Sequence, residues 1–310
     1  MEASIGITSS AMGYREPMDI LRDVDIAMYR AKKLGSGSYQ IFNPQMQAEA
    51  NARLQLEQDL RKAIPKKEFC LYYQPIVSLI TGKIKEVEAL VRWKHPQGII
   101  APNQFISVTE ETGLINPLGL WILREACSQL KVWQEQFPDL MLNMNVNFSP
   151  VQFQQVNLLE DVAKILKETG ISRNTLSIEI SETCLSQMLD SNLKLLQEIG
   201  VNLCLDDFCT GYSSLKMLGN LPINTLKIDR SFVQELINYP DDTKLIETII
   251  LLGKSFNLAV IAEGVETQEQ ATILRKLGCI WGQGYLFSYP LDYQDATKFI
   301  TENSDGRYLR

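Results

Sequence analysis

The sequence has a single histidine among its 310 residues. This residue, His95, stands in Lys-His-Pro-Gln-Gly, a pattern typical of a turn. One histidine excludes histidine-rich metal sites and argues against catalytic triads built on histidine. Any bound metal must therefore have oxygen ligands, which favours a hard ion such as Mg²⁺ or Mn²⁺.

Several other features are missing. No pair of cysteines forms a Cys-x-x-Cys motif, and the six cysteines are scattered along the chain at Cys70, Cys127, Cys184, Cys204, Cys209 and Cys279. This usage suits reduced thiols in a cytoplasm. The sequence shows no secretory signal core and no apolar run long enough to span a bilayer. We therefore expect a cytoplasmic location and no membrane contact by this chain. Membrane association of a longer protein would have to come from upstream domains.

The chain also lacks a basic stripe. Its formal net charge is −7 and its pI is about 5.0, which argues against nucleic acid as a partner. An acidic protein can still bind phosphate groups locally, through metal ions and a few placed cations. The apolar fraction of 45% and the charged fraction of 22% are ordinary for a globular protein. The length allows one large domain or two of ordinary size.

The first part of the chain, residues 1–42, reads as a small α+β fragment. Short strands are predicted at Ser4–Thr8 and Tyr39–Phe42, with an amphipathic helix at Met18–Lys33 between them. These elements are too few to form a stable core alone. A polar helical connector follows over Asn43–Lys67, and Pro65 ends it. We interpret residues 43–54 as a linker and 55–310 as the main domain; the alternative is a signalling helix that transmits input from upstream domains.

Strands and helices alternate from Phe69 onward. The strands at Phe69–Leu79 and Ile84–Trp93 are joined by Thr81-Gly82-Lys83, so they must be antiparallel. Each later strand follows a helix-length segment and can be parallel; these strands are Met141–Phe148, Leu176–Ile180, Asn202–Leu205, Thr225–Ile228, Ala259–Ala262 and Ile280–Leu286. The pattern predicts an α/β fold, a (β/α) barrel, with an open doubly wound sheet as the alternative.

One stretch, LCLDDFCTGYSSL at 203–215, stands out. An apolar strand runs directly into Asp206 and Asp207, and a Thr-Gly turn and a Ser-Ser pair that can cap a helix follow. Two adjacent carboxylates at a strand end repel each other unless a cation lies between them. An isolated pair would be read as a solvated turn, but here polar residues recur at successive strand ends.

The carboxyl ends of the strands meet at one end of a barrel. The residues found there are Glu88, Leu90, Arg92, Asn143, Asn145, Asn147, Glu179, Asp206, Asp207, Lys227, Asp229, Glu263, Glu266 and Gln283. Five carboxylates brought together require cations, and a pair of divalent ions is the economical answer. Asn147 would add a neutral oxygen ligand. Such a pair serves phosphoryl chemistry, with Lys227 orienting water or offsetting charge and Arg92 suited to a phosphate.

At this point a resemblance is specific. The segments YYQPI, VEALVRW, VNFSP, IEISET, DDFCTGYSSL, LKIDRSF, AEGVET and QGYLFSYP, in this order from about residue 55 to the end, resemble EAL domains, which are phosphodiesterases of cyclic di-GMP. DILRDVDIAMYRAKKLGSGSYQIF resembles the C-terminal tail of GGDEF (diguanylate cyclase) domains. The signature loop of that second family is absent, so no cyclase activity is expected, and Met1 is taken as the edge of a fragment.

The resemblance implies a modified TIM-type (β/α)8 barrel with one antiparallel strand. It implies one metal bound by Glu88, Asn147, Glu179 and Asp206, and a second served by Asp206, Asp207 and Glu263. Glu88, Asp207, Lys227 and Glu263 would be the catalytic set, in which Lys227 orients the attacking water and Glu263 is a candidate proton acceptor. The substrate groove would be lined by Gln74, Leu90, Arg92, Asp229, Glu266 and Gln283.

The resemblance also implies the reaction. One phosphodiester of cyclic di-GMP would be hydrolysed to linear 5′-pGpG with two Mg²⁺ or Mn²⁺ ions, and Ca²⁺ would inhibit. A homodimer through the EAL domain is implied as well. The family usually has glycine at position 209, where this chain has cysteine, in a loop that couples the dimer to the metal site and is anchored by Glu182. A non-glycine residue at φ > 0 is strained, so Cys209 bears on loop geometry. The alternative function is a cyclic di-GMP receptor or scaffold with little turnover.

Overall fold

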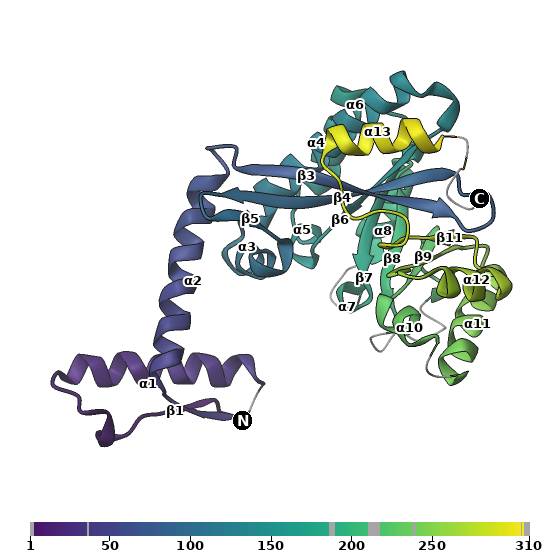
Figure 1. Ribbon diagram of the computed structural model, residues 1–310. Helices are drawn as coiled ribbons and strands as arrows, with labels where there is room; N and C mark the ends of the chain where they lie inside the picture. Colours follow the sequence, from purple (N-terminus) through teal and green to yellow (C-terminus); the bar gives the residue numbers. More distant parts are fainter. Residues whose placement is uncertain are drawn as a thin grey trace. The chain divides into compact units, whose positions relative to one another are not determined.

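The computed structural model describes residues 3–35, 37–185, 190–209, 218–237, 240–304 and 306. The chain divides into two compact units, Met1–Lys66 and Lys67–Arg310. Figure 1 shows the elements of each unit. Over the described ranges, no helix combines the length and the hydropathy that crossing a bilayer requires.

The N-terminal unit is a small α+β structure. It contains β1 (Ile5–Ile7), a 3₁₀ turn (Ser10–Met12), α1 (Pro17–Lys33), β2 (Tyr39–Ile41) and α2 (Pro44–Ala63). The strands pair in parallel, with Ile5 opposite Tyr39. Helix α1 lies so close to β1 that a Cβ added to Gly6 would come within 2.1 Å of the Val24 carbonyl oxygen. The two strands and the helix between them that the sequence predicts are confirmed.

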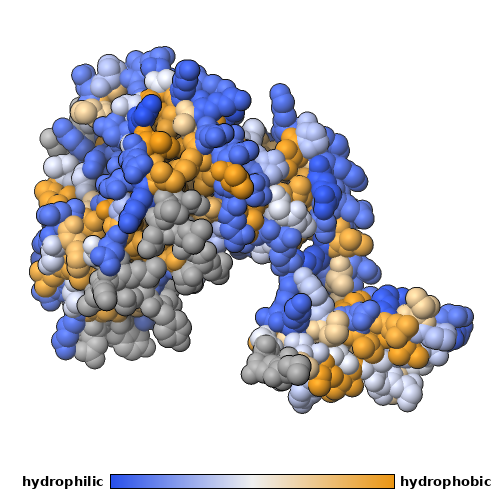
Figure 2. Space-filling view, turned by 180° about the vertical axis from the view of Figure 1, so that it is seen from behind, coloured by the Kyte–Doolittle hydropathy of each residue, from blue (hydrophilic) through white to orange (hydrophobic). Residues whose placement is uncertain are grey.

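The other face of β1 and β2 is exposed. Side chains alternate along a strand, so the apolar residues Ile5, Ile7, Tyr39 and Ile41 share the face opposite Gly6. Their exposure runs from 40% at Ile7 to 62% at Tyr39. Hydrophobic side chains are visible over the surface of this smaller unit in Figure 2. The buried cluster of the unit is small, with Ala27, Phe42 and Met46 at its centre and Ile26 packed against it.

The second unit is a closed barrel. Its strands are β3 (Phe69–Ser78), β4 (Ile84–His95), β5 (Gly98–Ile100), β6 (Asn143–Asn147), β7 (Leu176–Ser181), β8 (Asn202–Phe208), β9 (Thr225–Ile228), β10 (Ala259–Ala262) and β11 (Trp281–Gly282). Around the barrel the order is β3-β11-β10-β9-β8-β7-β6-β4, and β4 pairs back with β3. Strand β3 is antiparallel to both neighbours, the other neighbours in the ring are parallel, and β5 is an extra strand on β4. The predicted modified (β/α)8 barrel with one antiparallel strand is confirmed.

Helices connect the parallel strands and cover the outside of the barrel (Figure 1). They are α3 (Ile106–Thr112), α4 (Ile115–Gln136), α5 (Pro150–Phe153), α6 (Leu158–Thr169), α7 (Glu182–Leu185), α8 (Asp190–Glu198), α10 (Arg230–Glu235), α11 (Pro240–Ser255), α12 (Gln268–Lys276) and α13 (Tyr293–Asn303). Helix α4 shows why they pack there: Ile115, Ile122 and Trp133 belong to one buried apolar stripe. Short 3₁₀ turns lie at Pro102–Gln104, Pro138–Leu140 and Arg173–Thr175.

The last predicted strand, Ile280–Leu286, is wrong in its length, because β11 ends at Gly282. The chain then leaves the barrel and bonds to the segment after β10, with Val265 N–H donating to the Gln283 carbonyl at 3.0 Å. Gly284 permits this turn, since a Cβ there would lie 2.1 Å from the Val265 carbonyl oxygen. The sequence prediction also missed β5, whose three residues carry too little pattern. The Thr-Gly turn and Ser-Ser cap predicted after position 209 lie outside the described residues.

Candidate functional site

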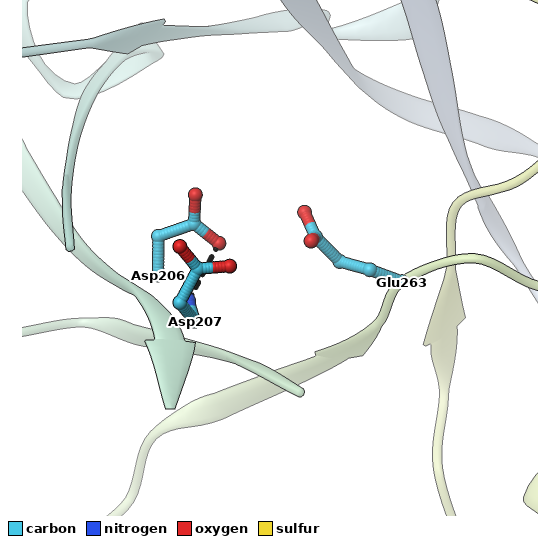
Figure 3. Close-up of side chains that lie close together, drawn as sticks. All are labelled: Asp206, Asp207 and Glu263. Atoms are coloured by element: carbon cyan, nitrogen blue, oxygen red, sulfur yellow. Dashed lines mark hydrogen bonds between the residues drawn. The ribbon is translucent and has the colours of Figure 1, made fainter. Parts of the chain in front are cut away.

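Two adjacent aspartates face the same space because β8 is irregular at its end. The pairing of β8 with β9 shifts between Leu205 and Phe208, and Asp207 has a φ of 53°. Such a bulge breaks the alternation of side chains, so neighbouring residues no longer point to opposite faces. The Asp207 N–H donates to Asp206 Oδ1 at 2.9 Å. Glu263, just after β10, points toward both from the other side (Figure 3), and one oxygen from each of the three carboxylates lies within 4.8 Å of the others.

Lys227 on β9 is the centre of a second group of charges. Its side chain is fully buried, and its Nζ lies 3.1 Å from Glu88 Oε2, 2.8 Å from Glu179 Oε1 and 2.7 Å from Glu263 Oε1. These contacts connect strands β4, β7 and β9 and the end of β10. We call Lys227, Glu88, Glu179 and Glu263 the lysine cluster. Glu263 belongs to both groups, so the structure brings the predicted carboxylates into one continuous site.

Amide side chains fix the orientation of Glu88. Gln283 Nε2 donates to Glu88 Oε2 at 2.6 Å, and Asn147 Nδ2 donates to Glu88 Oε1 at 2.6 Å. Gln283 also donates to Gln74 Oε1 at 3.2 Å. Gln74 donates in turn to the Ser288 carbonyl at 3.1 Å. The predicted residues Gln74, Glu88, Asn147 and Gln283 therefore form one hydrogen-bonded chain across β3, β4, β6 and the end of β11.

The site carries an excess of negative charge. Five carboxylates, those of Glu88, Glu179, Asp206, Asp207 and Glu263, lie here with two cationic side chains among the described residues, Lys227 and, at the adjoining cavity, Arg230. Burial and the charge of Glu88 raise the pKa of Glu179 well above its usual value. Burial also acts to raise the pKa of Glu88. The charge of Lys227 and the hydrogen bonds that Glu88 accepts from Gln283, Lys227 and Asn147 outweigh burial, so the pKa of Glu88 is lowered. Burial would lower the pKa of Lys227, yet the surrounding carboxylates raise it well above its usual value.

The other three carboxylates, Asp206, Asp207 and Glu263, all have raised pKa values. Burial raises the pKa of Asp206, with the charge of Glu88 adding to the effect against that of Lys227. Burial and the neighbouring Asp206 raise the pKa of Asp207 to about 6. Burial raises the pKa of Glu263 to about 8, although the Lys227 charge acts against it. Without added cations, the protein therefore holds protons on some of these carboxylates.

The five carboxylates and the amide of Asn147 fit hard divalent ions. Carboxylate and amide oxygens are the ligands that Mg²⁺ and Mn²⁺ prefer. Among the described residues, Glu179 Oε2 is buried and has no hydrogen-bond partner, which is costly for a polar atom unless a cation or a proton satisfies it. Charge excess and an unsatisfied ligand atom both indicate that the site can bind cations.

A cavity of about 210 Å³ opens beside the cluster. It is lined by Gln74, Glu88, Asp206, Arg230, Glu263, Gly264, Glu266, Gln283, Gly284 and Tyr285. Glu266 was predicted for the groove, and its side chain also accepts from Gln234 Nε2 at 3.3 Å. The sequence prediction missed Arg230 and Tyr285. Arg230 directly follows the predicted Asp229 in LKIDRSF, and Tyr285 lies two residues after the predicted Gln283 in QGYLFSYP. Both could therefore have been found from the sequence motifs.

Three predicted groove residues lie apart from this cavity. Leu90 lines a separate, mostly apolar cavity of about 300 Å³ that Asn147 also borders. The Arg92 guanidinium lies 5.5 Å from the centre of the Tyr72 ring. Burial lowers the pKa of Arg92, while the phenol groups of Tyr72 and Tyr285 act against it. Asp229 caps α10, accepting from the Ser231 N–H at 2.9 Å, and its interaction with Asp207 contributes to the raised pKa of that carboxyl.

The two residues predicted for the loop, Glu182 and Cys209, are close enough to interact. Glu182 is buried at the start of α7. Burial and then the Glu182 charge raise the pKa of the Cys209 thiol to about 11, so the thiol is protonated at neutral pH. Cys209 has a φ of 73°, a left-handed conformation in which a side chain is strained.

Comparison with known proteins places this geometry in context. The sequence profile of the EAL domain matches residues 57–290. The bifunctional diguanylate cyclase/cyclic di-GMP phosphodiesterase MucR of Pseudomonas aeruginosa is 39% identical over 295 residues, covering 94% of this chain and 43% of the relative. The cyclic di-GMP phosphodiesterase NbdA of the same organism is 36% identical over 304 residues, covering 97% of this chain and 39% of the relative.

The fold has a solved counterpart. The structure of the PaMucR phosphodiesterase in complex with c-di-GMP superposes with a TM-score of 0.75 and 40% sequence identity, covering 78% of this chain and 99% of the solved chain. The chain spans less than half the length of the curated relatives it matches, 37–43% for the first three.

Proposed function

The chain belongs to the EAL domain family, and we propose that it is a cyclic di-GMP phosphodiesterase in bacterial second-messenger signalling. The observation that carries the proposal is a continuous acidic site at the carboxyl ends of the barrel strands. Three carboxylates contact Lys227 there, and one of them, Glu263, also lies beside Asp206 and Asp207. Relatives and a solved structure with the same barrel are named for this activity or bind this ligand. The product proposed is linear 5′-pGpG.

Two divalent ions, Mg²⁺ or Mn²⁺, would neutralise phosphate oxygens and make an attacking water acidic enough to react near neutral pH. Glu88, Asn147, Glu179 and Asp206 are the proposed ligands of one ion, and Asp206, Asp207 and Glu263 those of the other. The rest of the chemistry falls to the chain's own side chains. Gln283 and Lys227 hold Glu88 in one orientation, so that the first set of ligands is preorganised.

The proposed reaction is a displacement at phosphorus. The oxygen of water bonds to phosphorus as the bond to the ribose 3′ oxygen breaks, and that oxygen takes up a proton to become a hydroxyl. Lys227, 2.7 Å from Glu263, orients the water and offsets the charge that develops on the phosphate. Glu263 accepts the proton that the water loses. Gln74, Glu266 and Gln283 line the cavity beside these groups, while Leu90, Arg92 and Asp229 are proposed to contact the parts of the substrate beyond it.

A second function remains a candidate because of Cys209. Its φ of 73° places a side chain where glycine would be unstrained, in the loop expected to couple the dimer to the metal site. A strained loop favours a receptor or scaffold that binds cyclic di-GMP and turns it over slowly.

We also propose that residues 1–42 are the C-terminal remnant of a GGDEF domain and that the EAL domain forms a homodimer. The match to MucR covers 94% of this chain, whereas residues 57–310 are only 254 of 310 residues, so the similarity extends into the N-terminal unit. MucR is itself named a diguanylate cyclase as well as a phosphodiesterase.

Product analysis tests the proposed function. Purified protein is incubated with cyclic di-GMP and Mg²⁺ or Mn²⁺, and nucleotides are separated by chromatography. We expect 5′-pGpG in both reactions and none with Ca²⁺ or after chelation. Tight binding in Ca²⁺ without product in Mg²⁺ would favour the receptor, and absence of any guanine-nucleotide binding would contradict both functions.

A further inference from the structure

The hairpin of β3 and β4 carries an aromatic–cation pair on the face that leads to the acidic site. Its register pairs Gln74 with Glu88 and Cys70 with Arg92, and Tyr72 stands on β3 between these two pairs. Because side chains alternate along a strand, Tyr72 and Arg92 lie on the same face of the hairpin as Glu88. The guanidinium carbon of Arg92 lies 5.5 Å from the centre of the Tyr72 ring, which is within the range of a cation–π interaction.

The guanidinium group of Arg92 keeps most of its hydrogen-bond donors available. Its Nη1 donates to the Val91 carbonyl at 2.9 Å, and no carboxylate in the described ranges forms an ion pair with it. Glu88, on the same face, is paired with Lys227 instead. Stacking occupies the flat face of a guanidinium, so the N–H groups at its edge remain available to an anion, and that edge fits two phosphate oxygens at once.

The pair stands on a rigid support. On the opposite face of the hairpin, Leu71, Tyr73 and Trp93 are buried, with exposures of 6%, 3% and 0%. The backbone under Tyr72 and Arg92 is therefore fixed by core packing. A long arginine side chain loses rotamer entropy when a ligand immobilises it, and a ring that already restricts the side chain reduces this loss.

Arg92 stands beside the proposed metal ligands rather than among them. It follows Glu88 by four residues, which is about 13 Å along an extended strand. Tyr285, whose phenol acts on the pKa of Arg92, lines the acidic cavity. A cyclic dinucleotide whose one phosphodiester reacts at the cavity would therefore present its second phosphodiester on the side where Arg92 lies.

We propose that Tyr72 is a positioning residue for substrate binding, whose ring holds the Arg92 guanidinium with its N–H edge toward a phosphate oxygen of the cyclic dinucleotide. This inference rests on the proposed function and extends it to a residue that does not itself touch the substrate. The contact lies away from the reacting phosphorus, so it is equally strong in the ground state and in the transition state. Its loss therefore raises KM and leaves kcat nearly unchanged.

Substitutions at Tyr72 separate the ring from apolar bulk. We expect Tyr72→Leu to raise KM for cyclic di-GMP by about 3- to 30-fold, the range for loss of one cation–π contact, with kcat within about 2-fold of wild type. Tyr72→Phe keeps the ring and should stay within about 2-fold in KM. Tyr72→Met is a second variant without a ring and should behave like Tyr72→Leu. Tyr29→Leu is the matched control, because it removes the same kind of pair, with Lys33, from the N-terminal unit.

A double-mutant cycle shows whether Tyr72 acts through Arg92. Arg92→Ala should raise KM at least as much as Tyr72→Leu does. In the Arg92→Ala background, Tyr72→Leu should change KM by less than about 2-fold, because the group that the ring positions is gone. A residue that contacts the substrate itself, or that merely supports the fold, would raise KM by a similar factor in both backgrounds. Thermal unfolding of each variant measures any loss of stability separately.

The outcomes distinguish this inference from the function beneath it. If wild-type protein neither binds nor hydrolyses cyclic di-GMP, the proposed function has failed and the inference falls with it. If wild-type protein binds without turnover, the same cycle is measured on Kd in Ca²⁺. If wild-type protein is active but Tyr72→Leu keeps the KM of wild type, or raises KM equally with and without Arg92, only the role of Tyr72 is wrong. An equal rise in KM for Tyr72→Leu and Tyr72→Phe would also overturn it, because the ring would then not be what holds Arg92.

Discussion

The N-terminal unit exposes apolar side chains, whereas the barrel unit buries charged ones. On β1 and β2, Ile5 and Tyr39 are more than half exposed, although parallel sheets are ordinarily covered on both faces. In the barrel, Lys227 and Glu179 have no exposed surface. The first departure follows from size, since 66 residues can bury only part of their apolar surface. Burying charged groups such as Lys227 and Glu179 costs several kcal/mol per ion and does not by itself stabilise the fold. Their burial therefore indicates a catalytic or binding role.

The largest expected effect concerns activity in the barrel. Glu88→Ala removes a carboxylate that contacts Lys227 and accepts from Gln283 and Asn147, and turnover of cyclic di-GMP should fall by at least about 10²–10³-fold. Glu86→Ala is the control, because Glu86 lies on the same face of β4 and bonds instead to Asn145. Steady-state kinetics in Mg²⁺ measure both variants. A rate for Glu88→Ala near that of wild type would contradict the assignment of the site.

The next effect concerns the stability of the same cluster. Lys227→Met keeps the volume but leaves Glu88, Glu179 and Glu263 without a buried cation, at a cost of about 3–5 kcal/mol in the free energy of unfolding. Urea titration at neutral pH without divalent ions measures this cost. Equal midpoints for the variant and wild type would show that the lysine does not stabilise the buried charges.

Charge excess predicts how stability depends on pH. Folding raises the pKa of Asp207 to about 6 and that of Glu263 to about 8, so the folded protein binds more protons than the unfolded chain. Stability without divalent ions should therefore fall as the pH rises from about 4, the usual carboxyl value, through these two values. Mg²⁺ should reduce the decline. A melting temperature that rises from pH 5 to pH 8 in chelator would have the wrong sign.

A smaller effect is expected in the β8 loop. Cys209→Gly removes a side chain from a left-handed conformation and should stabilise the fold by about 1 kcal/mol while preserving or raising turnover. Cys209→Ala is the control, since it removes the thiol but keeps the strain. A sharp loss of activity in Cys209→Gly would show that this position needs its side chain.

The smallest effect is expected at the exposed face of the N-terminal unit. Ile7→Thr and Ile41→Thr keep the β-branched shape. Because these residues are 40% and 57% exposed, the free energy of unfolding should change by less than about 0.5 kcal/mol. Ala27→Asp is the contrasting variant, since Ala27 is fully buried and should lose far more. A large loss in Ile7→Thr would mean that this face is packed.

Much of the fold could be predicted because periodicity and turn chemistry are local. The hairpin of β3 and β4 follows from the short connection that contains the Thr81-Gly82-Lys83 turn, and the strand at Thr225–Ile228 has the predicted bounds. The strand predicted at Ile280–Leu286 could not be shortened from sequence, because its end depends on the close approach of Gly284 to Val265.

The candidate site shows the same division. Polar residues at successive strand ends were enough to nominate Glu88, Glu179 and Lys227, which the barrel brings together. The pattern could not show that a bulge turns Asp206 and Asp207 to one side, since that depends on pairing with β9. Nor could it show the contact between Tyr72 and Arg92, because the hairpin register permits this contact but the side-chain rotamers decide it.

The most direct test of the account compares wild-type protein with Glu88→Ala in one assay of cyclic di-GMP hydrolysis at saturating Mn²⁺, with 5′-pGpG as the measured product. The account predicts steady formation of 5′-pGpG by wild type and almost none by the variant, although both are folded. Equal product from the two proteins, or no product from wild type at any Mn²⁺ concentration, would contradict it.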